Sequence, residues 1–480
     1  MATSRNHNYR QKSAQSDLVF GLDDKPSPSV SMFAALQHVL ASFIGIITPT
    51  LIVGGVLGLG AEVPYLVSMA LIVSGVGTFI QARRFGPVGS GLLCVQGTSF
   101  AFLSSILAAG FIVKNNGGGP DEILATIFGV CFVAAFVEIF LSRVIHKLRK
   151  IVTPIVTGTI ITLIGLSLIK VAMTDIAGGY GASDLGHPDN LGLAALVLMT
   201  IVVFNRFQFQ ILRLSAVIAG LTVGFAVAWS MGKVDFSGLN EVALIAIPEP
   251  FKYGFSFDIA AFIPIAVIFL ITPLETTGDL TANSMVSKQP VSGPVYIERI
   301  KSGVLADGVN SAIAATFNSL PMTTFSQNNG VIQLTGVASR HVAFFIAGIL
   351  VVLGMFPLIG GVLQQMPKPV LGGATLIMFG TVSIAGIKIL AEAGLNRRNI
   401  LIAATAIGIG LGVSNVPEVL QAMPPAIKNI FGSPISLGAF TAIALNLFLP
   451  ASSDEIANTA ESAAENTASA SSEPSEKSVA

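Results

Sequence analysis

The sequence PMTTFSQNNG, residues 321–330, places proline, hydroxyl and amide side chains at the start of an apolar run. Such a run makes a poor continuous helix, and non-helical backbone inside a membrane survives only where protein or a cavity satisfies its hydrogen bonds. The sequence GSG at residues 89–91 opens a second run, residues 92–112, in a similar way. Paired interrupted segments are the usual pointer to a transport site. We expect an extended stretch in each, followed by a half-helix that starts near Thr98 and near Gly330, with exposed N–H groups facing a common point.

The composition indicates a membrane protein. Of the 480 residues, 52% are hydrophobic and 11% are charged, whereas soluble domains have about 25% charged residues. Lys plus Arg and Asp plus Glu number 26 each, so the chain has no net charge with which to hold a nucleic acid. Cys94 and Cys131 both lie in apolar runs, which argues against a disulfide framework or a metal site. We expect no metal and no cofactor.

Apolar runs of about the 20 residues needed to cross a bilayer recur along the chain. The fourteen runs are residues 30–53, 64–82, 92–112, 122–142, 152–173, 190–205, 212–231, 258–284, 301–318, 322–337, 341–361, 369–390, 399–413 and 434–450. If the N-terminus is cytoplasmic, alternating sides place 20 of the 26 Lys and Arg residues in the cytoplasm, as the positive-inside rule requires. The sequence therefore predicts an all-α membrane protein with fourteen transmembrane spans and both termini in the cytoplasm.

The chain divides into four parts. Residues 1–28 are polar and lack the apolar core of a secretory signal, so we expect a cytoplasmic N-terminal segment. Residues 451–480 are mostly Ala, Ser and acidic residues, a composition typical of a disordered tail. Residues 29–233 and 234–450 hold seven spans each, and an odd number of spans inverts the second repeat relative to the first.

Two local correspondences support this 7+7 inverted repeat, because each links a span with the span seven places later. The QGT sequence at residues 96–98 in span three corresponds to QNNG at residues 327–330 in span ten. A Pro-x3-Gly-x6-Gly spacing occurs in both span five and span twelve, at Pro154, Gly158, Gly165, Pro369, Gly373 and Gly380.

Away from the ends of the spans there are four acidic residues, and each costs roughly 2.5–3.5 kcal/mol near the bilayer centre. Glu138 lies close in sequence to Arg143 at a cytoplasmic end, and we interpret it as a snorkelling or ion-paired residue. Glu275 and Asp279 are four residues apart and share one helical face. Two carboxylates on one buried face repel, so at least one should hold a proton, as a proton-coupled site requires; helix-linking hydrogen bonds are the alternative. Asp307 stays open between a proton relay and a structural link.

Other polar and aromatic residues complete the candidate site. His38 is the single mid-span histidine, either functional or a packing residue. Gln327 and Asn328 carry amides that match the N–H and C=O edge of a nucleobase, unless they merely satisfy broken backbone. Phe100 and Phe325 flank the two interrupted stretches and could sandwich a flat ring, or simply pack.

The segment QNNGVIQLTG, residues 327–336, resembles the signature of the nucleobase–ascorbate transporter family, also called nucleobase:cation symporter family 2, at every fixed position. The resemblance covers nearly the whole chain and is nearest to the bacterial xanthine permeases of that family. Its other parts are residues 37–38, 96–100, 275–279, 303–308 and 371–380.

The resemblance implies a proton-coupled symporter that imports an oxidised purine, with xanthine favoured and uric acid as the alternative. Uracil permeases of the family carry a carboxylate where this chain has Gln327, which argues against uracil. It also implies a homodimer in the bacterial inner membrane, with a core domain (spans one to four and eight to eleven) that moves against a gate domain (spans five to seven and twelve to fourteen). The implied substrate-binding residues are Glu275, Gln327, Phe100, Phe325 and Asn328, and those for proton coupling or support are His38, Asp279 and Asp307.

Two other classes of protein fit less well. An intramembrane enzyme would need a nucleophile with its base or a metal pair, and the chain has no His-Glu-x2-His and no Gly-x-Ser-x-Gly motif. An anion carrier or channel on the same 7+7 plan would have no use for a buried Glu275–Asp279 pair facing its anion. We therefore expect a purine carrier and not an enzyme.

Overall fold

The computed structural model describes residues 18–148, 153–179, 182–207, 209, 212–213, 215–234, 236, 243–291, 293–424, 428 and 431–450. The expected tail at residues 451–480 and the first part of the N-terminal segment lie outside the described residues. The first group of elements is α1 (Pro28–Leu57), η1 (Gly60–Glu62), α2 (Val63–Arg83), β1 (Gln96–Thr98), η2 (Phe100–Phe102), α3 (Leu103–Asn115), α4 (Pro120–Leu148), α5 (Pro154–Ile176), α6 (Pro188–Arg206) and α8 (Ala216–Ser230). The second group is α9 (Ile259–Val286), α10 (Gly293–Thr316), β2 (Met322–Thr324), α11 (Gln327–Thr335), α12 (Arg340–Gly354), α13 (Pro357–Gln364), α14 (Lys368–Glu392), α15 (Arg397–Asn415), η4 (Pro417–Leu420) and α17 (Pro434–Phe448).

Each of the fourteen apolar runs contains at least one of these helices, so the prediction of a multi-pass, predominantly helical membrane protein is confirmed. Within the described residues, seven helices are long and apolar enough to cross a bilayer on their own. The run at residues 341–361 instead forms α12 and α13, which meet at an angle of 69°. The runs at residues 92–112 and 322–337 hold shorter helices because a strand occupies part of each.

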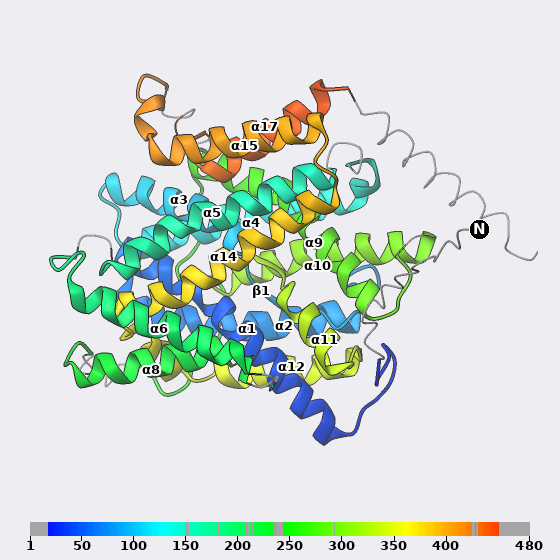
Figure 1. Ribbon diagram of the computed structural model, residues 1–480, viewed down its shortest axis with the longest axis horizontal. Coiled ribbons are helices and arrows are strands. Elements are labelled where there is room, and N and C mark those ends of the chain that lie inside the picture. The colour runs from blue at the N-terminus through cyan, green and yellow to red at the C-terminus, as the bar shows by residue number, and fades with distance from the viewer. Residues whose placement is uncertain are drawn as a thin grey trace, which may run out of the picture.

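The two interrupted segments meet at the centre of the molecule. β1 and β2 pair antiparallel, with Gln96 opposite Thr324 and Thr98 opposite Met322, and Figure 1 shows β1 surrounded by helices. The expected order of an extended stretch followed by a helix is therefore present in both segments. Antiparallel pairing is also the relation that an inverted repeat would give to its two copies.

The position expected for the second half-helix was wrong by three residues. α11 begins at Gln327 and not near Gly330, while the first half-helix begins at η2, close to the expected Thr98. The reason is a turn that closes directly after β2, in which the backbone N–H groups of Asn328 and Asn329 donate to the carbonyls of Phe325 and Ser326. Those two N–H groups are consequently not free to face a ligand, and the start of α11 presents amide side chains instead.

α5 and α14 pack side by side along their length (Figure 1). Glycines permit this close approach: a Cβ at Gly158 would lie 2.9 Å from the backbone N of Leu390, and one at Gly165 would lie 2.4 Å from the backbone N of Ser383. Because rising numbers in α5 meet falling numbers in α14, the two helices run antiparallel. The backbones of the two helices therefore approach each other closely along their length.

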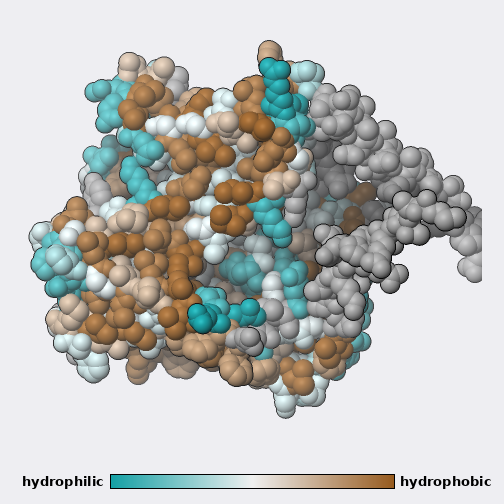
Figure 2. Space-filling view, viewed as in Figure 1, coloured by the Kyte–Doolittle hydropathy of each residue, from teal (hydrophilic) through white to brown (hydrophobic). Residues whose placement is uncertain are grey.

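The outer surface suits lipid. Figure 2 shows a broad face on which hydrophobic residues predominate and hydrophilic residues gather mainly near its edges. Monomeric soluble proteins rarely expose apolar patches larger than a few hundred Å2. Large hydrophobic side chains that are more than half exposed include Phe140, Met199, Val202, Ile384, Leu447 and Phe448.

Candidate functional site

Phe325 forms the centre of the site, between α1 and β1. A Cβ at Gly45 would lie 2.8 Å from its ring, and a Cβ at Gly97 would lie 2.5 Å from it, so two glycines make room for the ring. The ring is almost completely buried. Phe100, by contrast, is half-buried and meets the edge of Phe379 on α14, with ring centroids 5.4 Å apart. Phe100 belongs to η2 and Phe325 to the turn between β2 and α11, and among the described residues no ring contact joins the two, so they do not stack on each other.

Asp307 on α10 lies at the junction of four elements. Gln81 from α2 and Gln96 from β1 each donate to its Oδ1 at 2.8 Å, and Thr276 from α9 donates to its Oδ2. Its side chain has no exposed surface. All three partners are donors, the set that a carboxylate accepts, and together they connect the strand pair to the helices around it. This arrangement supports the structural-link interpretation of Asp307.

Asp279 on α9 holds the second strand. Its Oδ2 accepts a hydrogen bond from the Thr324 hydroxyl at 2.9 Å, and its backbone carbonyl accepts one from the Asn329 side chain at 3.2 Å. Asn329 in turn accepts from Asn283 of α9 at 2.9 Å. Asp279 is therefore a point where α9, β2 and α11 are fastened together, one helical turn after Glu275.

His38 of α1 and Asn328 of α11 are paired in the interior. The Asn328 side-chain nitrogen lies 2.9 Å from His38 Nδ1 and 3.2 Å from the His38 backbone carbonyl. An amide nitrogen only donates, so Nδ1 accepts and the proton of a neutral imidazole is on Nε2. Among the described residues, neither His38 Nε2 nor Asn328 Oδ1 has a hydrogen-bonding partner. The histidine thus fixes the position of an amide in the signature segment.

Glu275 and Gln327 differ from these residues because their polar groups are unpaired. Glu275 is partly exposed and Gln327 is exposed. In the part of the chain that the structure describes, neither side chain makes a hydrogen bond. The Gln327 amide nitrogen lies over α1, 3.3 Å from where a Cβ of Gly45 would be. Unpaired acceptors and donors beside a set of fastened neighbours are the groups available for a ligand.

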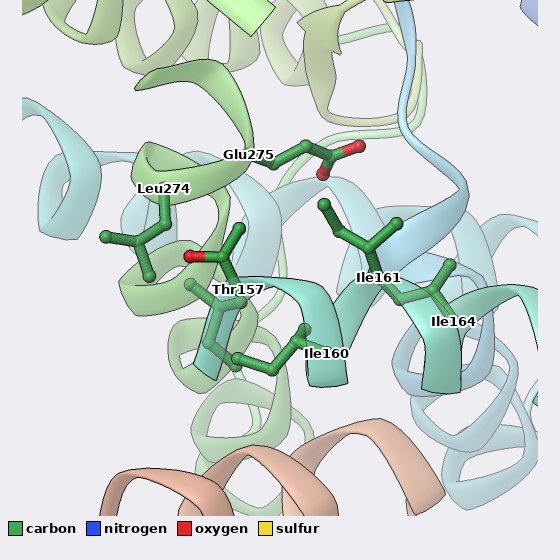
Figure 3. Close-up of a pocket in the computed structure, with 7 residues that line it drawn as sticks. Thr157, Ile160, Ile161, Ile164, Leu274 and Glu275 are labelled. Carbon is green, nitrogen blue, oxygen red and sulfur yellow. The ribbon is translucent and has the colours of Figure 1, made fainter. Parts of the chain in front are cut away.

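A small cavity, with room for about one water molecule, lies beside Glu275, between α9 and α5. Figure 3 shows the Glu275 carboxyl group above Ile161, with Thr157 and Ile160 nearby on the same helix. These α5 residues were not among the site residues predicted from the sequence. The sequence feature that marks these residues is their spacing, which puts them on one face of a helix. They are Thr157, Ile160, Ile161 and Ile164.

The interpretation of Glu138 as a snorkelling or ion-paired residue was wrong. Its side chain has no exposed surface, and its Oε2 accepts a hydrogen bond from Thr272 of α9 at 3.3 Å. Arg143 is exposed, and no ion pair joins it to Glu138 among the described residues. Five residues correspond to nearly one and a half turns of helix, so the two side chains lie on different faces of α4, one toward α9 and the other outward.

The polar groups that hold the buried acids in place were also not predicted from the sequence. Gln81 donates to Asp307 and accepts from the backbone N of Ser90, and Thr272 and Thr276 reach Glu138 and Asp307. Uncharged hydroxyl and amide residues are frequent in apolar runs and carry no marker of their role. Their partners are determined by which helices pack together.

The chain is similar to a known protein family and to two characterised permeases. The model of the Permease family (Xan_ur_permease) matches residues 29–419. The xanthine permease XanP of Escherichia coli K12 is 47% identical over 442 residues, covering 91% of this chain and 95% of that protein. The xanthine permease XanQ of the same strain is 46% identical over 441 residues, with coverage of 91% and 95%.

Two solved structures share the fold. The transmembrane domain of the cyanobacterial bicarbonate transporter BicA gives a TM-score of 0.55 at 14% identity, covering 84% of this chain and 99% of that domain. The murine anion transporter Slc26a9 in its inward-facing state gives a TM-score of 0.61 at 11% identity, covering 89% of this chain and 69% of that protein. These similarities concern the fold of a membrane transporter. The extent of the family match and the identity to the two permeases show that the chain belongs to this permease family, the nucleobase–ascorbate transporters, and is a transporter and not an enzyme.

Proposed function

We propose that this chain is a proton-coupled symporter that imports an oxidised purine nucleobase, xanthine first and uric acid as the alternative. The observation that carries the proposal is 47% identity to a xanthine permease over 91% of the chain, together with unpaired Glu275 and Gln327 side chains beside the strand pair. A carboxylate accepts the N–H groups of a purine, and a primary amide both donates to and accepts from an N–H and C=O edge.

The other candidate residues have supporting parts in this proposal. Asn328 shapes the site and is held by His38, while Asp279 fastens α9 to β2 near the ligand. Phe100 and Phe325 border the space that a flat ring would enter, and Asp307 links the helices or relays a proton. The Glu275 carboxylate would accept hydrogen bonds from the purine N–H groups. Its protonation would therefore be the step that couples protons to transport.

We further propose fourteen spans arranged as a 7+7 inverted repeat, residues 29–233 and 234–450, in the bacterial inner membrane with both termini cytoplasmic. Ion pairs support the grouping of the loops into two sets, one on each side of the membrane. Arg84–Glu298 at 3.3 Å and Arg340–Asp23 at 2.8 Å join segments that this topology places in the cytoplasm. Lys252–Glu62 at 3.3 Å and Lys233–Asp189 at 3.7 Å join segments that it places outside.

The proposed mechanism is alternating access between a core domain and a gate domain. The core would consist of α1–α4 with β1, and α9–α13 with β2. The gate would consist of α5, α6 and α8, and of α14, α15 and α17. The tight α5–α14 packing supports movement of the gate as one body, and the hydrogen bonds around Asp307 join elements of the core to one another. Two such subunits would form a homodimer.

Transport of an inorganic anion is the rival function, because the two solved structures of similar fold are a bicarbonate transporter and an anion transporter. The acids disfavour it. Glu275 lines the cavity and Asp279 lies one helical turn further along α9, and a carboxylate repels an anion instead of binding it.

An uptake experiment tests the proposal in cells that lack their own purine permeases. Labelled xanthine should enter, uric acid should compete more strongly than guanine, hypoxanthine, uracil or ascorbate, and a protonophore should abolish accumulation. Strict dependence on external sodium at constant pH would contradict proton coupling. Competition by chloride, sulfate or bicarbonate, with no effect of purines, would favour the anion carrier.

A further inference from the structure

One face of α5 lines the cavity beside Glu275. Thr157, Ile160, Ile161 and Ile164 follow each other at intervals of three and one, the spacing of a single helical stripe. Ile271, Leu274 and Glu275 of α9 form the opposite wall. Glu275 is the charged group of this lining, and Thr157 is the other residue in it with a polar side chain. The cavity thus presents one polar group on each wall.

The Thr157 hydroxyl differs from those of its neighbours. Thr159 donates to the carbonyl of Ile155 at 2.7 Å, and Thr162 donates to the carbonyl of Gly158 at 2.7 Å, so both hydroxyls are satisfied within the helix. Thr157 makes no such bond among the described residues and is partly exposed. Figure 3 shows its side chain at the rim of the cavity, close to Leu274 and on the same face of α5 as Ile161. It is therefore the hydroxyl on this face of α5 that a ligand can engage.

Thr157 lies next to the part of α5 that packs against α14. Gly158, directly after Thr157, lies against the backbone of α14 at Gly386 and Leu390. A ligand bound to Thr157 therefore contacts the packed pair of helices α5 and α14, whereas a ligand bound to Glu275 contacts α9. A ligand that touches both side chains connects two bodies that the proposed mechanism moves relative to each other.

We propose that α5 supplies the second wall of the purine site, with Thr157 as a specificity-determining residue that hydrogen-bonds a polar edge of the purine while Glu275 holds its N–H groups. Ile161 lies beneath the Glu275 carboxyl and supports the flat face of the ring. This proposal rests on the proposed function, because it needs a purine between α5 and α9, where the cavity is now the size of a water molecule and the two walls have to separate to admit the ring. It adds a contact from the gate side to a site otherwise built on α1, α9 and the two strands.

The test compares Thr157→Val, which keeps the shape and removes the hydroxyl, with Thr157→Ser, which keeps the hydroxyl. Losing one neutral hydrogen bond should raise the KM for xanthine roughly three- to tenfold in the valine variant, with the maximal rate less affected and serine close to wild type. Inhibition by purines that lack one carbonyl should become similar to inhibition by xanthine itself in the valine variant, since the discriminating contact is gone. Rates are expressed per molecule inserted in the membrane, and Thr157→Ala provides the same comparison if the valine variant does not insert.

Thr159→Val is the matched control, because it removes a hydroxyl from the same helix that is bonded within the helix. It should leave both the KM and the inhibition profile unchanged. If Thr157→Val matches Thr159→Val in both measurements, α5 does not contribute the contact and the proposal is overturned. Absence of xanthine uptake by the wild-type protein is a different result, and it would refute the proposed function itself.

Discussion

Gly45 of α1 gives the most direct test of the site geometry, because two candidate binding residues lie over it. A Cβ at this position would be 2.8 Å from the Phe325 ring and 3.3 Å from the Gln327 amide nitrogen. The first distance is shorter than real Cβ contacts allow, so in Gly45→Ala the ring has to move. Gly97 closes the other side of the ring, with its own Cβ position 2.5 Å away, and leaves little room for retreat.

The required displacement sets the size of the effect. Moving the ring from 2.8 Å to an ordinary contact of at least 3.4 Å needs about 0.6 Å. A misplacement of about 1 Å in a positioning group can cost 100-fold, so we expect Gly45→Ala to weaken xanthine binding roughly 10- to 100-fold. In free energy this is about 1.4–2.7 kcal/mol. Overpacking of a filled core costs a similar 1–3 kcal/mol or so and provides an independent estimate.

The assay is competition binding of xanthine to membranes that contain equal amounts of each variant. Gly348→Ala is the matched control, since Gly348 is also a helical glycine but a Cβ there would meet nothing within 4 Å. It should bind xanthine as the wild type does. Wild-type affinity in Gly45→Ala would refute the reasoning, because Phe325 and Gln327 would then be free to shift without affecting the ligand.

Four further substitutions, at three residues, probe the acids and the Gln327 amide. Glu275→Gln replaces an acceptor oxygen by a donor that faces a purine N–H, and an unpaired buried group costs about 1–3 kcal/mol; xanthine binding should fall at least tenfold, and normal uptake by the inserted variant would make Glu275 a structural residue. Gln327→Glu removes the donor and adds an acid near Glu275, so affinity for oxidised purines should drop. Gln327→Asn should weaken binding without changing the preference for oxidised purines. Unchanged inhibition profiles in both variants would show that Gln327 only forms hydrogen bonds with interrupted backbone. Glu138→Gln keeps the size and the acceptor for Thr272, so the hydrogen bond is preserved and uptake should stay close to wild type. Loss of uptake with normal insertion would instead assign Glu138 a proton-carrying role.

The amino-acid sequence determined the class of protein and the location of its unusual segments. Fourteen apolar runs each gave at least one helix, because an apolar run long enough to cross a bilayer is stable there only if its backbone bonds to itself. Pro321 and the polar residues after it prevented a continuous helix, and a strand followed by a short helix resulted. The signature at residues 327–336 pointed to the family, and the family match confirmed it.

Tertiary structure decided which side chains form hydrogen bonds with one another. Glu138 and Arg143 are near in sequence, but the faces of α4 direct one to Thr272 and the other outward. Gln81 and Gln96 both donate a hydrogen bond to Asp307, although each is more than 200 positions from it in the sequence. No local sequence pattern encodes these two bonds. Hydrogen bonds inside a membrane protein are selected by which helices pack together, because an amide or hydroxyl can pair with many neighbours of equal chemistry. For the same reason Thr157 was indistinguishable from other threonines in the sequence, and only the packing of α5 against α9 and α14 placed it at the cavity.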